Sequence, residues 1–150
     1  MDQDLDEFPE GTPQRFSVQL FIRHPTMHPA EITAALGMDP LFQHVVGEPR
    51  RTPKGTHLPG TYPCTDWRYS VRYEVKDQWF AEKVTELVDR LVPHRDFLHR
   101  LRSTGGEAMI IVQFLGDDGH FGDNIPLETL ANLADLKLEL GIEVYMVPQN

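Results

Sequence analysis

Hydrophobic and polar residues alternate with a period of two along three stretches of the chain, residues 16–23, 67–75 and 136–147. This alternation predicts β-strands that have one buried and one polar face. A fourth stretch, residues 108–115, is almost wholly apolar and predicts a central strand that is covered on both sides. In the last alternating stretch, Gly141 is expected to form a β-bulge.

The stretch 67–75, WRYSVRYEV, has the most regular alternation. Trp67 and Tyr69 fall on the face that we expect to pack against helices. Arg68 and Arg72 fall on the opposite, charged face, which meets water or a partner. We therefore expect a sheet with one buried face and one exposed face.

Apolar residues recur at helical spacing in other regions of the chain. Residues 29–36 predict a short helix that begins at a proline and stops before a glycine. Residues 80–91 predict a longer helix, which Pro93 should kink before it continues over residues 96–102. A last helix should begin at residue 126 and end at residue 135 or 136.

Residues 38–66 contain five prolines and three glycines and have no sustained period. We expect a long loop there, of the kind that is often functional or mobile, with a short strand permitted at residues 42–46. The order β-α-(β)-β-α-β-α-β favours an α+β fold, a single largely antiparallel sheet with helices packed on one face. With the short strand counted, the first six elements match a ferredoxin-like order, followed by an extra α-β unit.

The chain of 150 residues is long enough for one domain with its own core. Residues 1–15 are acidic and interrupted by proline and glycine, so we expect a flexible tail before a single α+β domain over residues 16–150. No apolar run has the length of a membrane span, and the start lacks the pattern of a secretory signal. The single cysteine, Cys64, cannot form an internal disulfide, and the expected location is cytoplasmic.

The formal net charge of −9 argues against broad nucleic-acid binding, which depends on neutralising phosphates. It suits a basic protein partner, such as a toxin. A plainer interpretation is that acidity keeps the protein soluble.

Several features in separate parts of the chain recur together in a known family. They are the segment EITAALGMDP at residues 31–40, the GEPRR run that begins at Gly47, the strand-opening Trp67, and Tyr145 near the end. In this combination the chain resembles the bacterial domain-of-unknown-function family 4279 over residues 16–147. The resemblance implies a single small α+β domain with no settled activity, for which immunity-type or regulatory roles are suspected.

Three groups of side chains are candidates for catalysis or metal binding, and for each we favour a structural role. Cys64 has no base suggested by the sequence, so we interpret it as an incidental thiol. The pairs His24 with His28 and His94 with His99 lack the spacing of ligands on a regular helix. An oxygen-rich turn could bind a cation, but its residues are also typical of plain turns and do not match the calcium-loop pattern. Its candidate ligands are Asp117, Asp118, His120 and Asp123. We expect no metal and no cofactor.

A basic set in an otherwise acidic chain is the strongest remaining candidate for a site. It consists of Arg50, Arg51, Lys54, Arg68 and Arg72. Arg50, Arg51, Arg68 and Arg72 are the predicted ligand- or partner-binding residues, because guanidinium groups suit carboxylates and phosphates. The alternative is that these arginines pair with acids of the protein itself.

Three functions are compatible with these features. We favour a non-enzymatic protein-interaction domain, of an immunity, inhibitor-like or regulatory kind, because the chain is small and acidic and has no recognisable catalytic motif. The alternative is a small-molecule or anion-binding domain that uses the arginine-rich face. An enzyme of unfamiliar type ranks third.

Overall fold

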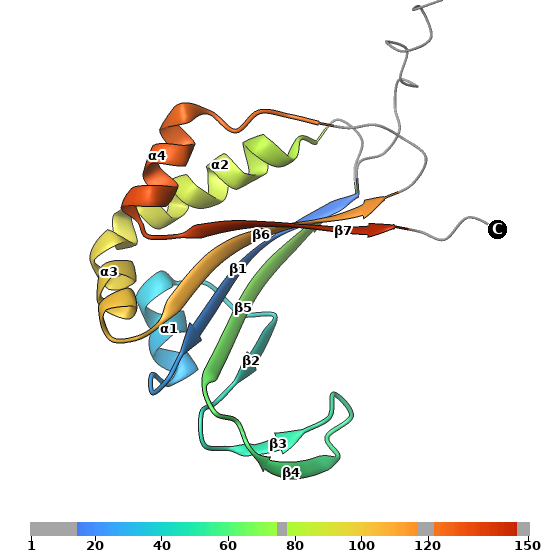
Figure 1. The fold of residues 1–150 in the computed structure, drawn as a ribbon, viewed down its shortest axis with the longest axis vertical. Helices are drawn as coiled ribbons and strands as arrows, with labels where there is room; N and C mark the ends of the chain where they lie inside the picture. Colours follow the sequence, from blue (N-terminus) through green and yellow to red (C-terminus); the bar gives the residue numbers. More distant parts are fainter. Residues whose placement is uncertain (1–14, 75–77, 117–121, 147–150) are drawn as a thin grey trace, which may run out of the picture.

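The computed structural model describes residues 15–74, 78–116 and 122–146 (Figure 1). The predicted tail lies outside the described residues, apart from Arg15. The elements follow in the order β1 (Phe16–His24), α1 (Pro29–Leu36), β2 (Phe42–His44), β3 (Pro49–Arg51), β4 (His57–Thr61), β5 (Thr65–Tyr73), α2 (Phe80–Leu91), α3 (Arg95–Ser103), β6 (Glu107–Gly116), α4 (Leu127–Asp135) and β7 (Glu139–Met146). A 3-10 turn at Val92–His94 joins α2 to α3, where Pro93 predicted a kink.

Helix α1 begins and ends where local chemistry requires it. Pro29 occupies the first helical position, and the His28 ring accepts a backbone N–H of the first turn. Gly37 follows the helix with a φ of 65°, a left-handed conformation that glycine adopts without strain. Ile32 and Leu36 are buried on the face that meets the sheet.

The main sheet among the described residues has five strands in the order β2-β5-β1-β6-β7. Three of its pairings are antiparallel, and β6 and β7 run parallel. The helices α1 to α4 lie on the same side of this sheet (Figure 1). The expected α+β class, with a largely antiparallel sheet and helices on one face, is therefore confirmed.

A second, two-stranded sheet corrects the prediction of a single sheet and of a long loop over residues 38–66. Strands β3 and β4 form an antiparallel hairpin that projects beyond the Thr65 end of β5 (Figure 1). Every residue of these two strands is exposed. Because neither face of the hairpin is buried, no alternation of hydrophobic residues marked it in the sequence.

Two further expectations about the sheet were wrong. Gly141 forms no bulge, because the register of β6 and β7 runs without a shift through the pair Ile111–Gly141. Strand β6 is covered on one face only: Ile110 and Val112 are buried under the helices, whereas Met109 and Ile111 on the other face are half-buried. The expectation that this strand is covered on both sides is therefore wrong, because the second face of β6 is apolar but partly exposed.

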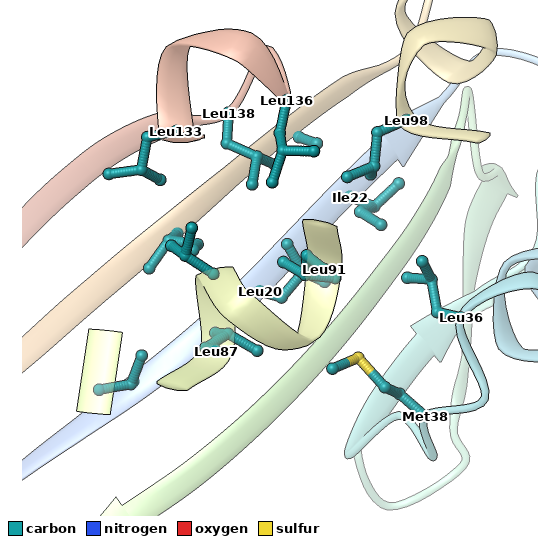
Figure 2. Packing of buried hydrophobic residues seen from close by; sticks show 14 of the residues in the cluster. Leu20, Ile22, Leu36, Met38, Leu87, Leu91, Leu98, Leu133, Leu136 and Leu138 are labelled. Carbon is teal, nitrogen blue, oxygen red and sulfur yellow. The ribbon is translucent and has the colours of Figure 1, made fainter. Parts of the chain in front are cut away.

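The core lies between the sheet and the helices (Figure 2). Leu20 and Ile22 of β1 meet Leu91 of α2 and Leu98 of α3, and all four side chains are at most 1% exposed. Trp67 is fully buried on the same face, as predicted, and its indole Nε1 donates to Thr33 Oγ1 of α1 at 3.0 Å.

None of the helices within the described residues combines the length and the apolar character that crossing a membrane requires.

Candidate functional site

The face of the main sheet that points away from the helices, called the open face below, has no described element over it. Phe21 lies between Arg68 and Met109 at its centre, and Gln19 lies between Ser70 and Ile111. The side chains of β1, β5 and β6 on this face are Ser17, Gln19, Phe21, Arg23, Asp66, Arg68, Ser70, Arg72, Glu107, Met109, Ile111 and Gln113. The face thus carries apolar, polar and charged groups in one layer.

Arg68 and Arg72 both lie on the open face of β5, as the alternation predicted. The guanidinium carbon of Arg68 is 5.0 Å from the centre of the Phe21 ring. Its Nε is buried and has no hydrogen-bond partner among the described residues. Arg72 has only a loose contact, 3.7 Å from Glu74, between two largely exposed side chains. Neither arginine is therefore held by a close internal ion pair in the described part of the chain.

Arg50 and Arg51 lie on β3 of the small hairpin and not on the main sheet. Arg50 donates to the carbonyl of Pro59 at 3.4 Å. The backbone of Arg51 is fixed by the hydroxyl of Tyr62, which accepts from its N–H at 3.0 Å and contacts its carbonyl oxygen at 3.3 Å. The structure thus brings Arg68 and Arg72 onto one face and places Arg50 and Arg51 on a separate hairpin. Whether the four bind a common partner stays a prediction.

A cleft of about 910 Å³ connects this hairpin to the edge of the main sheet. Phe42, His44 and Tyr62 form its aromatic wall, in which the rings of His44 and Tyr62 stack with their centres 3.9 Å apart. Arg51 also lines the cleft, and Phe42 lies directly opposite Arg68 in the register of β2 and β5. Phe42 therefore lines the same cleft as Arg51 and also lies opposite Arg68 of the open face.

Arg23 and Phe21 belong to the site, although the sequence did not single them out as site residues. The guanidinium carbon of Arg23 is 5.4 Å from the centre of the Phe21 ring, so Phe21 contacts two arginines. Arg23 is paired with Asp66 at 2.9 Å, and this hydrogen bond and charge raise the pKa of Arg23. Asp66 thereby satisfies Arg23, and no carboxylate of the described residues pairs with Arg68. The one signal in the sequence was Phe21, which interrupts the polar face of its strand.

Two glutamines, the buried Gln19 and the half-buried Gln113, form a hydrogen-bonded relay across the open face to the exposed Glu143. Glu143 accepts from Gln113 Nε2 at 2.7 Å, and Gln113 Oε1 accepts from Gln19 Nε2 at 2.6 Å. Because a carboxylate only accepts, Glu143 fixes the orientation of both amides. Gln19 is only 5% exposed, and its Oε1 has no partner among the described residues. The open face therefore holds an acceptor on Gln19 and a donor on Arg68 that no described residue uses.

Cys64 does not have the surroundings of a reactive thiol. Its side chain is half-buried, and Sγ lies 3.8 Å from Asp66 Oδ1. Burial and the negative charge of Asp66 raise the pKa of the Cys64 thiol. A raised pKa lowers the fraction of the nucleophilic thiolate at neutral pH, which supports the interpretation of an incidental thiol.

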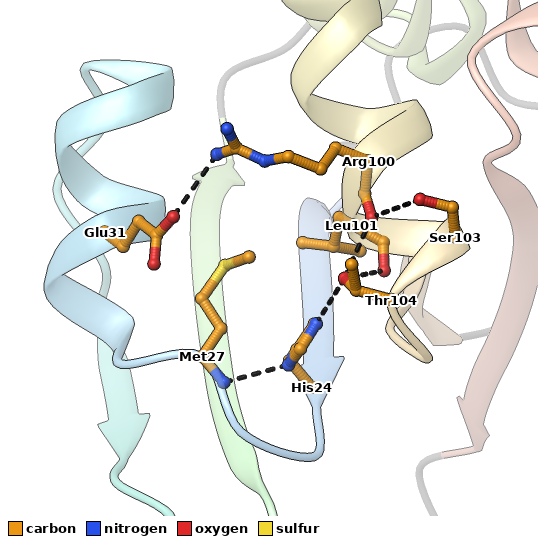
Figure 3. A network of polar contacts seen from close by, with 7 residues as sticks. All are labelled: His24, Met27, Glu31, Arg100, Leu101, Ser103 and Thr104. Atoms are coloured by element: carbon orange, nitrogen blue, oxygen red, sulfur yellow. Dashed lines mark hydrogen bonds and ion pairs between the residues drawn. The ribbon is translucent and has the colours of Figure 1, made fainter.

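His24 and His28 have structural roles. His24 is buried, and its Nδ1 accepts the backbone N–H of Met27 at 2.9 Å (Figure 3). Its proton is then on Nε2, which donates to Thr104 Oγ1 at 2.8 Å. Burial lowers the pKa of the His24 imidazole, so the ring is neutral. His24 ties the turn after β1 to the end of α3, and His28 caps α1.

The oxygen-rich turn is mostly outside the described residues, which omit Asp117, Asp118 and His120. Asp123 is described, and its carboxylate accepts the backbone N–H of Asn124 at 2.8 Å, a local turn contact. Within residues 15–74, 78–116 and 122–146, no cluster of three histidine, cysteine or acidic side chains is arranged to hold a metal ion.

Comparison with curated proteins and with solved structures found no match for the chain. Comparison with protein families found one that covers nearly all of the fold described above. The model of the family called domain of unknown function DUF4279 matches residues 14–147. This match confirms the resemblance inferred from residues 31–40, Gly47, Trp67 and Tyr145, and the chain belongs to the DUF4279 family.

Proposed function

We propose that the chain is a non-enzymatic protein-interaction domain, of an immunity, inhibitor-like or regulatory kind, that binds its partner on the open face. The observation that carries this proposal is the absence of any described element over a face that holds Phe21, Met109 and Ile111 beside Arg68. Uncovered apolar groups rimmed by polar ones are typical of protein interfaces.

The charges on the open face support a protein partner over a simple anion. Arg68 and Arg72 lie on its β5 side, whereas Glu107 and Glu143 lie on its β6 and β7 side. Two regions of opposite charge that flank an apolar centre can select a partner and fix its orientation. The net charge of −9 favours a partner that is basic overall, such as a toxin.

The proposal includes two finer statements about the protein. We place it in the bacterial cytoplasm, which the single cysteine supports. We also take the arrangement of β1, β2, β5 and β6 to be ferredoxin-like, which their spatial order β2-β5-β1-β6 supports.

Affinity capture from the native host with a matched pair of variants tests the proposal. Ile111→Glu introduces a charge at the centre of the open face, and Leu127→Glu introduces the same charge at a site on α4 that is 85% exposed. The wild type and Leu127→Glu should capture the same protein, and Ile111→Glu should lose it while remaining folded by circular dichroism. If no captured protein is lost specifically with Ile111→Glu, the proposal is wrong.

Anion or small-molecule binding is the second candidate function. The Nε of Arg68, which has no hydrogen-bond partner in the described part of the chain, and the cleft at Arg51 favour it. A ligand that binds the folded state raises the melting temperature, so a thermal-shift screen with phosphate, citrate and a broad metabolite set tests it. A rise that is lost with the double substitution Arg68→Ala and Arg72→Ala would support this function. No rise with any compound would count against it.

A further inference from the structure

The outer edge of β5 is only partly covered. Strand β2 pairs with residues 66–68, and the N–H of Leu41 donates to the carbonyl of Arg68 at 2.8 Å. Beyond that point, from Ser70 to Tyr73, β1 pairs with the inner side of β5 and no strand of the described chain pairs with its outer side (Figure 1). Half of an edge strand is thus available for pairing.

The register shows which backbone groups point to this edge. Leu115 donates its N–H to the carbonyl of Arg15, so the odd-numbered residues of β1 turn their backbone groups toward β6 and the even-numbered ones toward β5. The register of β1 with β5 then directs the backbone of Val71 toward β1. The N–H and C=O groups of Ser70 and Arg72 therefore point outward, where no described strand receives them.

A strand added at this edge would place alternate side chains on the two faces of the sheet. On the helix side they would meet a hollow of about 160 Å³ between β5 and α2, whose lining combines apolar and aromatic side chains with charged ones: Val18, Tyr69, Val71, Tyr73, Leu87, Lys83, Glu86 and Arg90. The apolar part of this lining, around Tyr69 and Leu87, can receive an apolar side chain.

On the open face the added side chains would meet two cations. Arg68 has no carboxylate partner among the described residues, and Arg72 has only its loose contact with Glu74. Arg68 and Arg72 lie on one face of one strand with Ser70 between them. This side of the edge suits acidic side chains, although the chain as a whole is acidic.

We infer that β5 binds an extended segment of the partner by β-strand addition, and that this segment alternates acidic and apolar residues. The inference rests on the proposed function, because it specifies how the same surface holds a protein. The backbone of Ser70 and Arg72 supplies the pairing, Arg68 and Arg72 select the acidic residues, and the hollow beside Tyr69 and Leu87 selects the apolar ones.

A fluorescein-labelled peptide of alternating glutamate and valine tests the inference by fluorescence polarisation with the full chain. The peptide should bind, and added salt should weaken the binding. A peptide with lysine in place of glutamate should not bind. Two N-methylated peptides, each methylated on one alternate set of amides, should differ, because only one set faces β5. Equal binding of the two methylated peptides, or equal binding of the lysine peptide, would overturn the inference.

Substitutions at Ser70 test the edge from the side of the protein. Ser70→Pro removes an outward N–H that no described strand uses, so the pairing of β1 with β5 remains, as circular dichroism should verify. It should weaken peptide binding by about tenfold or more. Ser70→Ala keeps the N–H and should bind like the wild type. Equal affinity of the two variants would contradict strand addition.

Two outcomes separate this inference from the proposed function. A cellular partner that Ile111→Glu loses and Ser70→Pro keeps would leave the proposed function standing and overturn strand addition. A chain that captures no partner through the open face would remove the proposed function, whatever the peptides do.

A peptide of residues 1–8, which is also acidic, serves as a competitor. If it binds more tightly than the designed peptide, the occupant is this chain itself, and the assignment to a partner is wrong.

Discussion

Replacing Trp67 by alanine removes the largest side chain among the fully buried residues together with its hydrogen bond to α1. The indole lies between β5 and α1, where its Nε1 donates to Thr33 Oγ1 at 3.0 Å. Both contributions are lost in Trp67→Ala, and the neighbouring helix and sheet can close the resulting cavity only in part.

The expected loss follows from the size of the side chain. Substituting a buried tryptophan by alanine costs about 3–5 kcal/mol of unfolding free energy. The hydrogen bond to Thr33 accounts for about 1 kcal/mol of this, since Thr33 is half-buried and water can replace its partner. For a chain of this length, a loss of that size lowers the melting temperature by about 10 °C or more.

Urea denaturation followed by far-UV circular dichroism measures this loss, and the second tryptophan supplies a matched control. Trp79 is 46% exposed, so Trp79→Ala should cost less than about 1 kcal/mol. Thr33→Val isolates the hydrogen bond and should cost about 1 kcal/mol. Equal losses for Trp67→Ala and Trp79→Ala would show that the buried face of β5 has been assigned wrongly.

Three further predictions concern other parts of the structure. Because burial lowers the pKa of His24, this side chain is protonated in the unfolded chain before it is protonated in the folded one as the pH falls below about 6.5, and the free energy of unfolding decreases there. His24→Asn should flatten this decrease in urea titrations between about pH 7 and pH 5. The control His57→Asn, at an exposed site, should leave the decrease unchanged. Gly106→Ala places a Cβ 2.7 Å from the Leu101 carbonyl oxygen and should cost about 1–3 kcal/mol by the same denaturation assay; a neutral result would mean that this turn can relax. Arg68→Ala combined with Arg72→Ala should shift the melting temperature by about a few degrees at most, because neither arginine has a close ion pair with a described residue. The double substitution should still abolish partner or anion binding, and retained binding would remove these arginines from the site.

The sequence predicted the elements whose burial alternates or repeats along the chain itself. In α1, Pro29 and Gly37 set both ends, and both act on the backbone within the helix. In β5, the alternation around Trp67 placed the arginines on the opposite face, where the structure has them. These features depend on local chemistry or on one buried face, so one chain segment contains the information.

The features that the sequence did not predict depend on neighbouring strands. The hairpin of β3 and β4 buries neither face, so it leaves no hydrophobic pattern. Gln19 looked like a residue that faces water, but it is buried because side chains of β6 and β5 flank it. The pairing of Asp66 with Arg23, and not with Arg68, follows from the register of β1 with β5. The arrangement of the candidate site is therefore determined by how the strands β1, β5 and β6 pair, which no single segment of the sequence shows.

Methyl NMR of the chain, free and bound to its captured partner, tests most directly whether the open face is the binding surface. Met109 and Ile111 report on the open face, and Leu127 and Leu130 report on an exposed part of α4 on the helix side. Binding through the open face predicts that the methyl signals of Met109 and Ile111 shift on complex formation while those of Leu127 and Leu130 stay in place. Shifts confined to Leu127 and Leu130 would contradict it.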